Sequence, residues 1–213
     1  MSASLTVEGQ QTARHESKTR ILQAALQVIR AKGYTATRVE DLCAAAGVTK
    51  GSFFHHFDSK EELAIEAANY WDELTSGLFE SADYHQRPTA RERLLAYIDL
   101  RKALLAGELP EFTCFVGTMV QELYQTEPAI RDACARSIGG HAQTLEADIA
   151  EAMHDCDLHP EWTAESLALH TQAVIQGAFI LAKAKGQARY AAESIDHLRR
   201  YCELLFPVRA KEA

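Results

Sequence analysis

The side chains best suited to chemistry gather in one short stretch, residues 49–56, which reads TKGSFFHH. This stretch supplies one ammonium group, two hydroxyl groups and two imidazole rings, with Gly51 among them. Ammonium and hydroxyl groups hydrogen-bond to the base edges and phosphate oxygens of DNA, and a glycine lets the backbone approach a ligand closely. We therefore interpret residues 49–56 as a candidate nucleic-acid contact.

Two short helices are expected to position this stretch. Thr37 and Glu40 have the T-x-x-E spacing of a capping box, which predicts a helix over residues 39–46 that ends at Gly47. Thr49 is the expected N-cap of a second helix over residues 50–57. Polar residues at the start of such a second helix reach base edges in the major groove. The pattern therefore predicts a helix-turn-helix.

A third helix must lie behind this pair, because two helices of about two turns each bury little surface on their own. Residues 17–31 supply an apolar face for that purpose, and a second capping box at residues 59–62 starts a longer helix to residue 81. The positions expected to face inward are Val39, Leu42, Cys43, Ala46, Val48, Phe53 and Phe57. An ordinary helical hairpin with a polar outer face is the alternative, and two capping boxes flanking a glycine corner favour the helix-turn-helix.

Composition fits a folded globular protein better than a protein that coats DNA without sequence preference. The 213 residues are 47% hydrophobic and 24% charged, as is typical of folded domains. The net charge of −8 is uneven, because residues 1–60 hold eight Lys/Arg and five Asp/Glu whereas the remainder carries −11. This asymmetry predicts a mildly basic docking face on an acidic body. It argues against an architectural protein that binds by non-specific phosphate neutralisation.

The cysteines and the hydropathy indicate a reducing compartment. The five cysteines are odd in number, scattered and without a C-x-x-C pair, and they are Cys43, Cys114, Cys134, Cys156 and Cys202. No stretch approaches the roughly 20 apolar residues that a membrane helix needs, and the start of the chain lacks a signal-peptide layout. We therefore expect a cytoplasmic protein without membrane association.

Helical spacing of apolar residues runs through the whole chain, and strand patterns are nearly absent. Nine helices are expected, over residues 17–31, 39–46, 50–57, 59–81, 89–106, 111–124, 128–154, 163–185 and 191–206. The predicted fold is all-α, with an N-terminal three-helix domain over residues 16–60 and a C-terminal helical bundle over residues 61–207. Residues 1–15 and 208–213 are expected to be flexible tails.

Residues 47–57, GVTKGSFFHHF, followed by SKEEL at residues 59–63, resemble the signature of the TetR family of bacterial transcriptional regulators. The close match covers residues 17–64. The resemblance implies a homodimeric repressor that binds a palindromic DNA operator and releases it when a small-molecule effector binds residues 61–207. Together, the exposed face of the second helix and the resemblance predict the DNA-binding residues Thr37, Arg38, Thr49, Lys50, Gly51, Ser52, His55, His56 and Lys60.

The resemblance also distributes roles within this set. Lys50 and Ser52 match positions that contact bases, whereas Arg38, His56 and Lys60 match positions that contact phosphates, and Thr37 matches a cap at the same surface. One departure concerns Phe54, which stands where the family often has a tyrosine whose hydroxyl reaches a phosphate. Phenylalanine has no such hydroxyl, so Phe54 is left out of the predicted site.

The C-terminal part carries weaker signals. By the resemblance, the helices over residues 163–185 and 191–206 form the dimer interface, although their apolar stripes also fit an ordinary core. Aromatic and sulfur-containing residues gather on the middle helices, and each could equally belong to a core. The candidate ligand-binding residues among them are Trp71, Tyr97, Phe112, Cys114, Phe115 and Met119.

Residues 113–118 and 121–123 resemble a branch of the family whose members respond to electrophiles through a cysteine. Cys114 lies early in its predicted helix, a position that favours a reactive thiol, so the alternative function is a thiol-based sensor of electrophiles or oxidants. His154, Cys156 and His159 match no standard zinc spacing, and we expect no metal or other cofactor. Catalytic motifs such as G-x-S-x-G and H-E-x-x-H are absent from the sequence, so we expect no enzyme.

Overall fold

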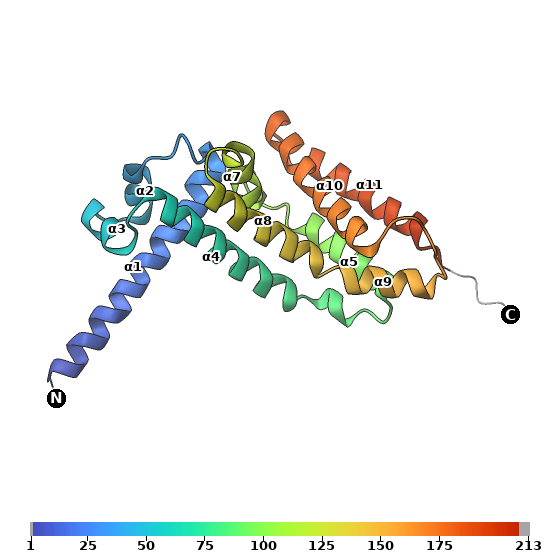
Figure 1. Cartoon of the computed structure of the whole chain (residues 1–213), viewed down its shortest axis with the longest axis horizontal. Helices are drawn as coiled ribbons and strands as arrows, with labels where there is room; N and C mark the ends of the chain where they lie inside the picture. Colours follow the sequence, from blue (N-terminus) through green and yellow to red (C-terminus); the bar gives the residue numbers. More distant parts are fainter. Residues whose placement is uncertain (1, 209–213) are drawn as a thin grey trace. The chain divides into compact units, whose positions relative to one another are not determined.

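The computed structural model describes residues 2–208, with side chains from His15 onward. Every regular element in this part of the chain is helical, which confirms the all-α prediction (Figure 1). The elements are α1 (Ser2–Lys32), α2 (Val39–Ala46), α3 (Lys50–His56), α4 (Lys60–Glu80), the 3₁₀ helix η1 (Asp83–Gln86), α5 (Ala90–Ala103), α6 (Leu109–Phe112), α7 (Phe115–Leu123), α8 (Pro128–Gln143), α9 (Glu146–Asp155), α10 (Ala164–Lys185) and α11 (Arg189–Leu205). Among the described residues, no helix has the length and apolar content needed to cross a membrane.

The chain forms two compact units. The first unit consists of Met1–Leu74 and Phe115–Ala135, and the second consists of Thr75–Cys114 and Arg136–Ala213. Helices α4 and α8 therefore each contribute residues to both units. The backbone passes from one unit to the other after Leu74, Cys114 and Ala135.

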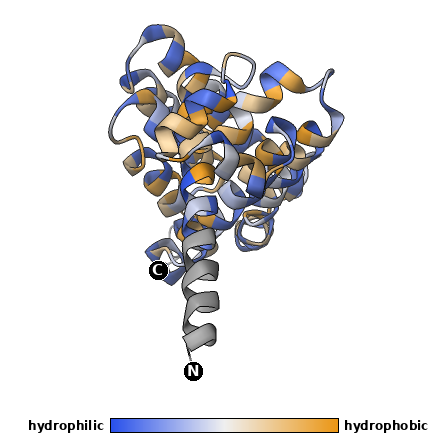
Figure 2. Cartoon of the chain, turned by 90° about the vertical axis from the view of Figure 1, so that its left-hand side faces the viewer, coloured by the Kyte–Doolittle hydropathy of each residue, from blue (hydrophilic) through white to orange (hydrophobic). Residues whose placement is uncertain are grey.

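The core of the first unit forms around α1, which contacts α2, α3 and α7. Ile21 and Ile29 on α1 are fully buried, as are Leu42 on α2 and Phe53 on α3. Burying a side chain of this size contributes about 1.5–3 kcal/mol, so these contacts fix the two short helices that could not be stable alone. Figure 2 shows the corresponding alternation of hydrophobic and hydrophilic residues around the helices.

The core of the second unit forms where α5, α9, α10 and α11 pack together. Its central residues come from each of these helices, and Tyr97, Ile98, Ile149 and Ile175 are all fully buried. The pair α10 and α11 runs side by side (Figure 1). This unit is the helical bundle expected from the sequence.

Two of the nine predicted helices are each divided in two, which gives the eleven α-helices of the described residues. The predicted helix over residues 111–124 is interrupted at Thr113, which has extended backbone angles. The predicted helix over residues 128–154 is interrupted at Thr144, whose hydroxyl donates to the carbonyl of His141 at 2.8 Å. This local hydrogen bond competes with the helical pattern, and neither interruption is marked by glycine or proline.

The first helix begins at Ser2 instead of near Ser17. Apolar periodicity indicates where a helix has a buried face. It does not indicate how far the helical backbone continues beyond that face. Residues 2–14 contain no proline and a single glycine, so the helix continues through them. The aperiodic segment at the N-terminus is therefore helical in its backbone, and most of the predicted C-terminal tail, residues 209–213, lies outside the described residues.

Candidate nucleic-acid interface

The corner between α2 and α3 is built as the sequence predicts. Gly47 adopts the left-handed conformation, with φ 63° and ψ 40°, which residues with a Cβ rarely adopt. The N–H of Val48 donates to the carbonyl of Cys43 at 3.0 Å and so closes the end of α2. The Thr49 hydroxyl then accepts a hydrogen bond from the N–H of Ser52 at 3.1 Å and caps α3. These bonds set the direction in which α3 leaves the corner.

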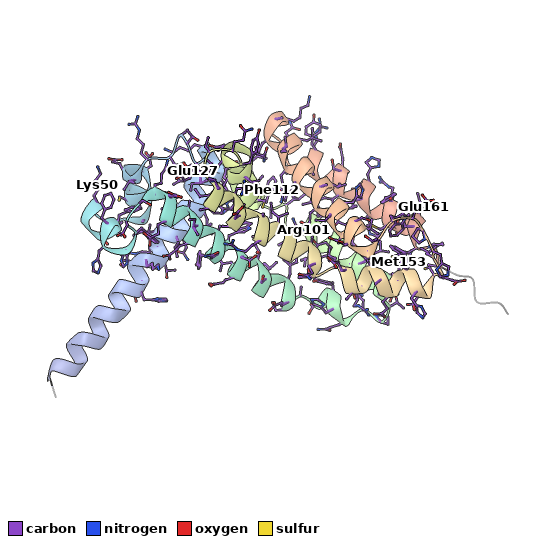
Figure 3. All side chains as sticks on the ribbon, in the orientation of Figure 1. Lys50, Arg101, Phe112, Glu127, Met153 and Glu161 are labelled. Carbon is purple, nitrogen blue, oxygen red and sulfur yellow. The ribbon has the colours of Figure 1, made fainter. Side chains whose placement is uncertain are left out.

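Helix α3 has one buried face and one exposed face. Phe53 is fully buried, and Phe57, directly after the helix, is 1% exposed. Lys50, Gly51 and His55 are exposed, whereas Ser52 and His56 are half-buried. Arg38, just before α2, is exposed as well. Figure 3 shows Lys50 at the periphery of the first unit. The polar residues of residues 49–56 thus share an accessible surface, as a major-groove contact requires.

Lys50 is engaged by an acidic neighbour on the preceding helix. Its ammonium forms an ion pair with the carboxylate of Glu40, and both side chains are 58% exposed. The hydrogen bond from Lys50 holds the pKa of the Glu40 carboxyl below its ordinary value, and the same bond raises the pKa of Lys50. Exposed ion pairs are weak, so Lys50 remains available to a stronger anionic partner such as DNA.

Lys60, the first residue of α4, makes several contacts within the chain that the sequence did not indicate. Its ammonium donates to the carbonyl oxygens of Tyr34 and Thr37, at 3.1 and 3.0 Å. It also lies 4.0 Å from the centroid of the Tyr34 ring, an arrangement typical of a cation–π contact. Burial lowers the pKa of this ammonium. Lys60 therefore fixes the turn between α1 and α2, whatever further contact it makes.

Thr37 requires a correction. Its side chain is 1% exposed, and its hydroxyl donates to the carbonyl of Gly33 at 2.6 Å. The predicted capping box of Thr37 and Glu40 is not formed: the N-cap of α2 is Arg38, whose backbone N–H donates to the Asp41 carboxylate at 2.8 Å. Thr37 therefore holds the turn and does not present its hydroxyl to solvent.

Sequence reasoning missed Glu122, near the end of α7. Its carboxylate accepts hydrogen bonds from the backbone N–H groups of Tyr34 and Thr35, at 3.1 and 2.9 Å. The turn before α2 is thus held from two sides. Its N–H groups donate to Glu122 of α7, and its carbonyl groups accept from Lys60 of α4. Gly33 adjoins this contact, where an added Cβ would lie 2.3 Å from a Glu122 oxygen. The glycine was the only local signal, since the two partners lie 87 residues apart.

His56 contacts α1. Its Nε2 lies 2.7 Å from the hydroxyl of Ser17, which ties the end of α3 to the first helix. The imidazole remains half-buried at the border of the exposed face. His56 is therefore positioned by α1, whereas the neighbouring His55 is exposed.

The six candidate ligand-binding residues are divided between the two units. Trp71, Phe115 and Met119 belong to the first unit, whereas Tyr97, Phe112 and Cys114 belong to the second. Phe115 and Met119 are fully buried, and the Trp71 and Phe115 rings lie 6.2 Å apart. Aromatic content along the sequence could not reveal this division.

In the second unit, Phe112 packs against Phe179, with ring centroids 6.2 Å apart. Cys114 is half-buried and lies immediately before α7 instead of within it. Tyr97 is fully buried and takes part in a polar cluster with side chains from three helices. Among the described residues, no group of three or more His, Cys, Asp or Glu side chains is arranged to hold a metal ion.

Comparison with known proteins identifies the family. The pattern described as "Bacterial regulatory proteins, tetR family" matches residues 21–67, which include α2, α3 and the corner between them. The pattern described as "Tetracyclin repressor-like, C-terminal domain" matches residues 90–198, just over half of the chain. The chain belongs to the TetR family. It is a DNA-binding transcriptional regulator of the helix-turn-helix type, as the signature at residues 47–63 predicts.

Individual relatives of this TetR-family chain agree in fold and class. The HTH-type transcriptional repressor DhaR of Mycobacterium sp. (strain GP1) is 26% identical over 172 residues, covering 80% of this chain and 84% of that protein. The uncharacterised HTH-type regulator YerO of Bacillus subtilis (strain 168) is 35% identical over 57 residues, which are 27% of this chain and 20% of that protein. A structure of the TetR family regulator CifR, a cysteine mutant complexed with 26-bp double-strand operator DNA, has a TM-score of 0.71 at 21% identity and covers 85% of this chain and 94% of that one.

Proposed function

We propose that this TetR-family protein is a cytoplasmic repressor that binds a palindromic operator and leaves it when a small molecule binds residues 61–207. The observation that supports the DNA contact best is the exposed polar face of α3 opposite the buried Phe53. A face of this kind, beginning at the capped N-terminus of the helix, suits entry into the major groove. The name of DhaR, a repressor, and the operator complex of CifR support the class of function.

The contacts divide by chemistry. Lys50 and Ser52 stand at the start of α3 and are assigned to base edges, because a cation and a hydroxyl there match acceptors in the major groove. Arg38, His55, His56 and the backbone at Gly51 are assigned to phosphates, together with the N–H groups around Thr49. Thr37 and Lys60 are assigned the positioning of the turn, because both are bonded to it.

Dimerisation is assigned to the outer face of α10 and α11. Some apolar residues of these helices, among them Leu167, Ile195 and Leu198, are buried within the chain. Other apolar residues on the same two helices are exposed, comprising Leu169, Ile180, Leu181, Tyr201 and Leu204. An exposed apolar face of this kind marks an interaction surface, and a two-fold dimer presents two copies of α3 about 34 Å apart.

The effect of a bound effector is transmitted to α3 through the chain segments that join the two units. The chain passes between the two units within α4, before α7 and within α8, and α7 carries Glu122, which is bonded to the turn before α2. A ligand that displaces these segments changes the spacing of the two recognition helices. A coupling free energy of about 1–3 kcal/mol, typical of allostery, corresponds to a change of about 5- to 150-fold in operator affinity.

A thiol-based response is the second candidate. The observation that favours it is the place of Cys114, the last residue of the second unit before the chain enters α7 of the first. Modification at this point would act directly on the segment that leads to Glu122. The test is alkylation of the full chain: operator affinity should fall in the native protein and not in Cys114→Ser, and an equal response in both proteins would refute it.

The leading proposal is tested by selecting DNA from a random-sequence duplex pool with the purified full chain. We expect a palindromic site with two half-sites about one helical turn apart. Ile180→Glu with Leu204→Glu should give a folded monomer with much weaker binding to that site, and the exposed pair Glu161→Gln with Glu165→Gln serves as a control. A selected site without two-fold symmetry, or full binding by the monomer, would overturn the proposal.

A further inference from the structure

The second unit contains a polar cluster inside its aromatic core. It consists of Tyr97 and Arg101 of α5, His141 of α8 and Gln172 of α10, and is called the Arg101 cluster below. The Tyr97 hydroxyl lies 2.9 Å from His141 Nε2, and Gln172 Nε2 donates to that hydroxyl at 3.1 Å. Arg101 Nη1 lies 3.1 Å from the same His141 nitrogen. Figure 3 marks the place of Arg101.

The hydrogen-bond directions in the cluster are fixed by its arginine. A guanidinium group only donates, so His141 Nε2 must be an unprotonated acceptor. The Tyr97 hydroxyl therefore donates to that nitrogen and accepts from Gln172. Burial, assisted by the positive charge of Arg101, lowers the pKa of His141 to about 3. The imidazole is therefore neutral at physiological pH.

The cluster therefore holds one uncompensated positive charge. Within the described residues, no carboxylate lies within ion-pair distance of Arg101, and its hydrogen bonds use Nη1 alone. Two arginines of this unit, Arg93 on α5 and Arg199 on α11, are each paired with two carboxylates. Arg93 binds Asp148 and Glu151, and Arg199 binds Asp99 and Glu203.

The surroundings of Arg101 make the lack of a counter-ion costly. The guanidinium lies 5.2 Å from the ring centroid of Phe79 and 6.0 Å from that of Tyr97, and both rings are buried. A partly buried charge is stabilised when it is paired and hydrogen-bonded. Arginine presents donors in a planar fork that fits a carboxylate with two parallel bonds. Here the donors at Nε and Nη2 are the ones left for such a partner.

We propose that the effector of this protein is an organic anion, a carboxylate with an apolar body, whose carboxylate binds Arg101 while its apolar part lies against the aromatic core around Phe79 and Tyr84. This inference rests on the proposed function, because it names the chemical class of the effector. Tyr97, His141 and Gln172 are positioning residues in this site, since they orient one another and the guanidinium. A neutral ligand of the same shape leaves the charge of Arg101 unpaired and binds more weakly.

The test uses the full chain and a series of straight-chain carboxylates from formate to decanoate, with the alcohols of equal length as neutral probes. Binding is measured by calorimetry and by the shift in Tm, at constant ionic strength set with chloride. We expect at least one carboxylate to bind and raise the Tm, and its alcohol to bind about tenfold to a hundredfold less tightly, as for loss of a charge-assisted hydrogen bond. Arg101→Gln should lose this difference, whereas Arg87→Gln, an exposed arginine of the same unit, should keep it.

Two further measurements keep the outcomes distinct. Arg101→Lys retains the charge without the fork, so it should recover part of the preference for carboxylate over alcohol if the anion contact is real. Should Arg101→Gln bind every carboxylate as the native chain does, or should no carboxylate raise the Tm of the native chain more than that of Arg101→Gln, the proposal is overturned. Operator binding is measured in parallel without any probe. If the chain binds no operator, the proposed function is refuted, and the result with the carboxylates is judged separately.

Discussion

The ammonium of Lys50 and the carboxylate of Glu40 form an ion pair that joins the two helices of the helix-turn-helix. The residue assigned to a base edge thus carries its own counter-ion, which stands on the preceding helix. Both side chains are exposed, so the pair is readily exchanged for another partner. DNA binding in this account replaces Glu40 with an acceptor on the duplex.

Glu40→Gln should therefore strengthen DNA binding. The substitution removes both the competitor for Lys50 and a negative charge that faces phosphates, while retaining a polar side chain of similar size. We expect affinity for duplex DNA to rise a few-fold in titrations followed by fluorescence anisotropy at low salt, with the gain shrinking as salt rises. The exposed Glu193→Gln on α11 makes the same charge change away from α3. Equal affinities for the native chain and Glu40→Gln would contradict the exchange.

Glu122→Ala should destabilise the first unit. The change leaves the N–H groups of Tyr34 and Thr35 without the acceptors that they have at 3.1 and 2.9 Å. The loss should be about 1–3 kcal/mol in urea unfolding, as for hydrogen bonds to a charged group, and Glu122→Gln should lose less because it retains one acceptor oxygen. Glu193→Ala is the matched control. A free energy of unfolding unchanged in Glu122→Ala would show that the contact contributes nothing.

Phe54 offers a sharp test of what α3 faces. Its ring is 53% exposed and stands one helical turn after Lys50, and the apolar group at base edges of the major groove is the thymine methyl. We expect replacement of thymine by uracil at one operator position to weaken binding of the native chain, and to weaken binding by Phe54→Ala much less. The comparison is made on the selected duplex with each thymine replaced in turn. If no replacement distinguishes the two proteins, Phe54 does not contact a thymine methyl.

His141 predicts a pH dependence of stability. Its pKa is lowered to about 3 in the folded chain, below the ordinary value near 6.5 in an unfolded chain. Between these values the unfolded state binds one more proton than the folded state, so stability is lost as pH falls below about 6.5, by up to about 1.4 kcal/mol per pH unit. His141→Gln should flatten this slope between pH 6.5 and 5 in urea unfolding. If the free energy of unfolding depends on pH equally in the native chain and in His141→Gln, other groups cause the dependence.

Local signals predicted the parts of the site that local hydrogen bonds create. Gly47 and Thr49 act within a few residues of themselves, and both have the roles that the sequence indicated. The register at the start of α2 could not be decided in this way, because Thr37 and Arg38 each have an acidic residue three positions later. In the structure Glu40 pairs with Lys50 of α3, and Asp41 accepts the hydrogen bond at the start of α2.

Contacts between distant segments could not be predicted from the sequence. Glu122 meets the turn at Thr35 across 87 residues, and no periodicity or motif reports such a meeting. The division of the candidate ligand-binding residues between two units has the same origin, because aromatic residues close in sequence, such as Phe112 and Phe115, belong to different units. Arg101 gave no signal either, since its significance lies in the absence of a nearby carboxylate among the described residues.

The central claim is that Lys50 and Ser52 read bases from the exposed face of α3. The most direct measurement is the ratio of affinities for the selected duplex and a scrambled duplex, compared between the native chain and Lys50→Ala with Ser52→Ala. The account predicts that the ratio falls by about tenfold or more, with the helical circular dichroism unchanged and with Lys185→Ala on α10 behaving as native. A ratio that survives both substitutions in a folded protein would contradict it.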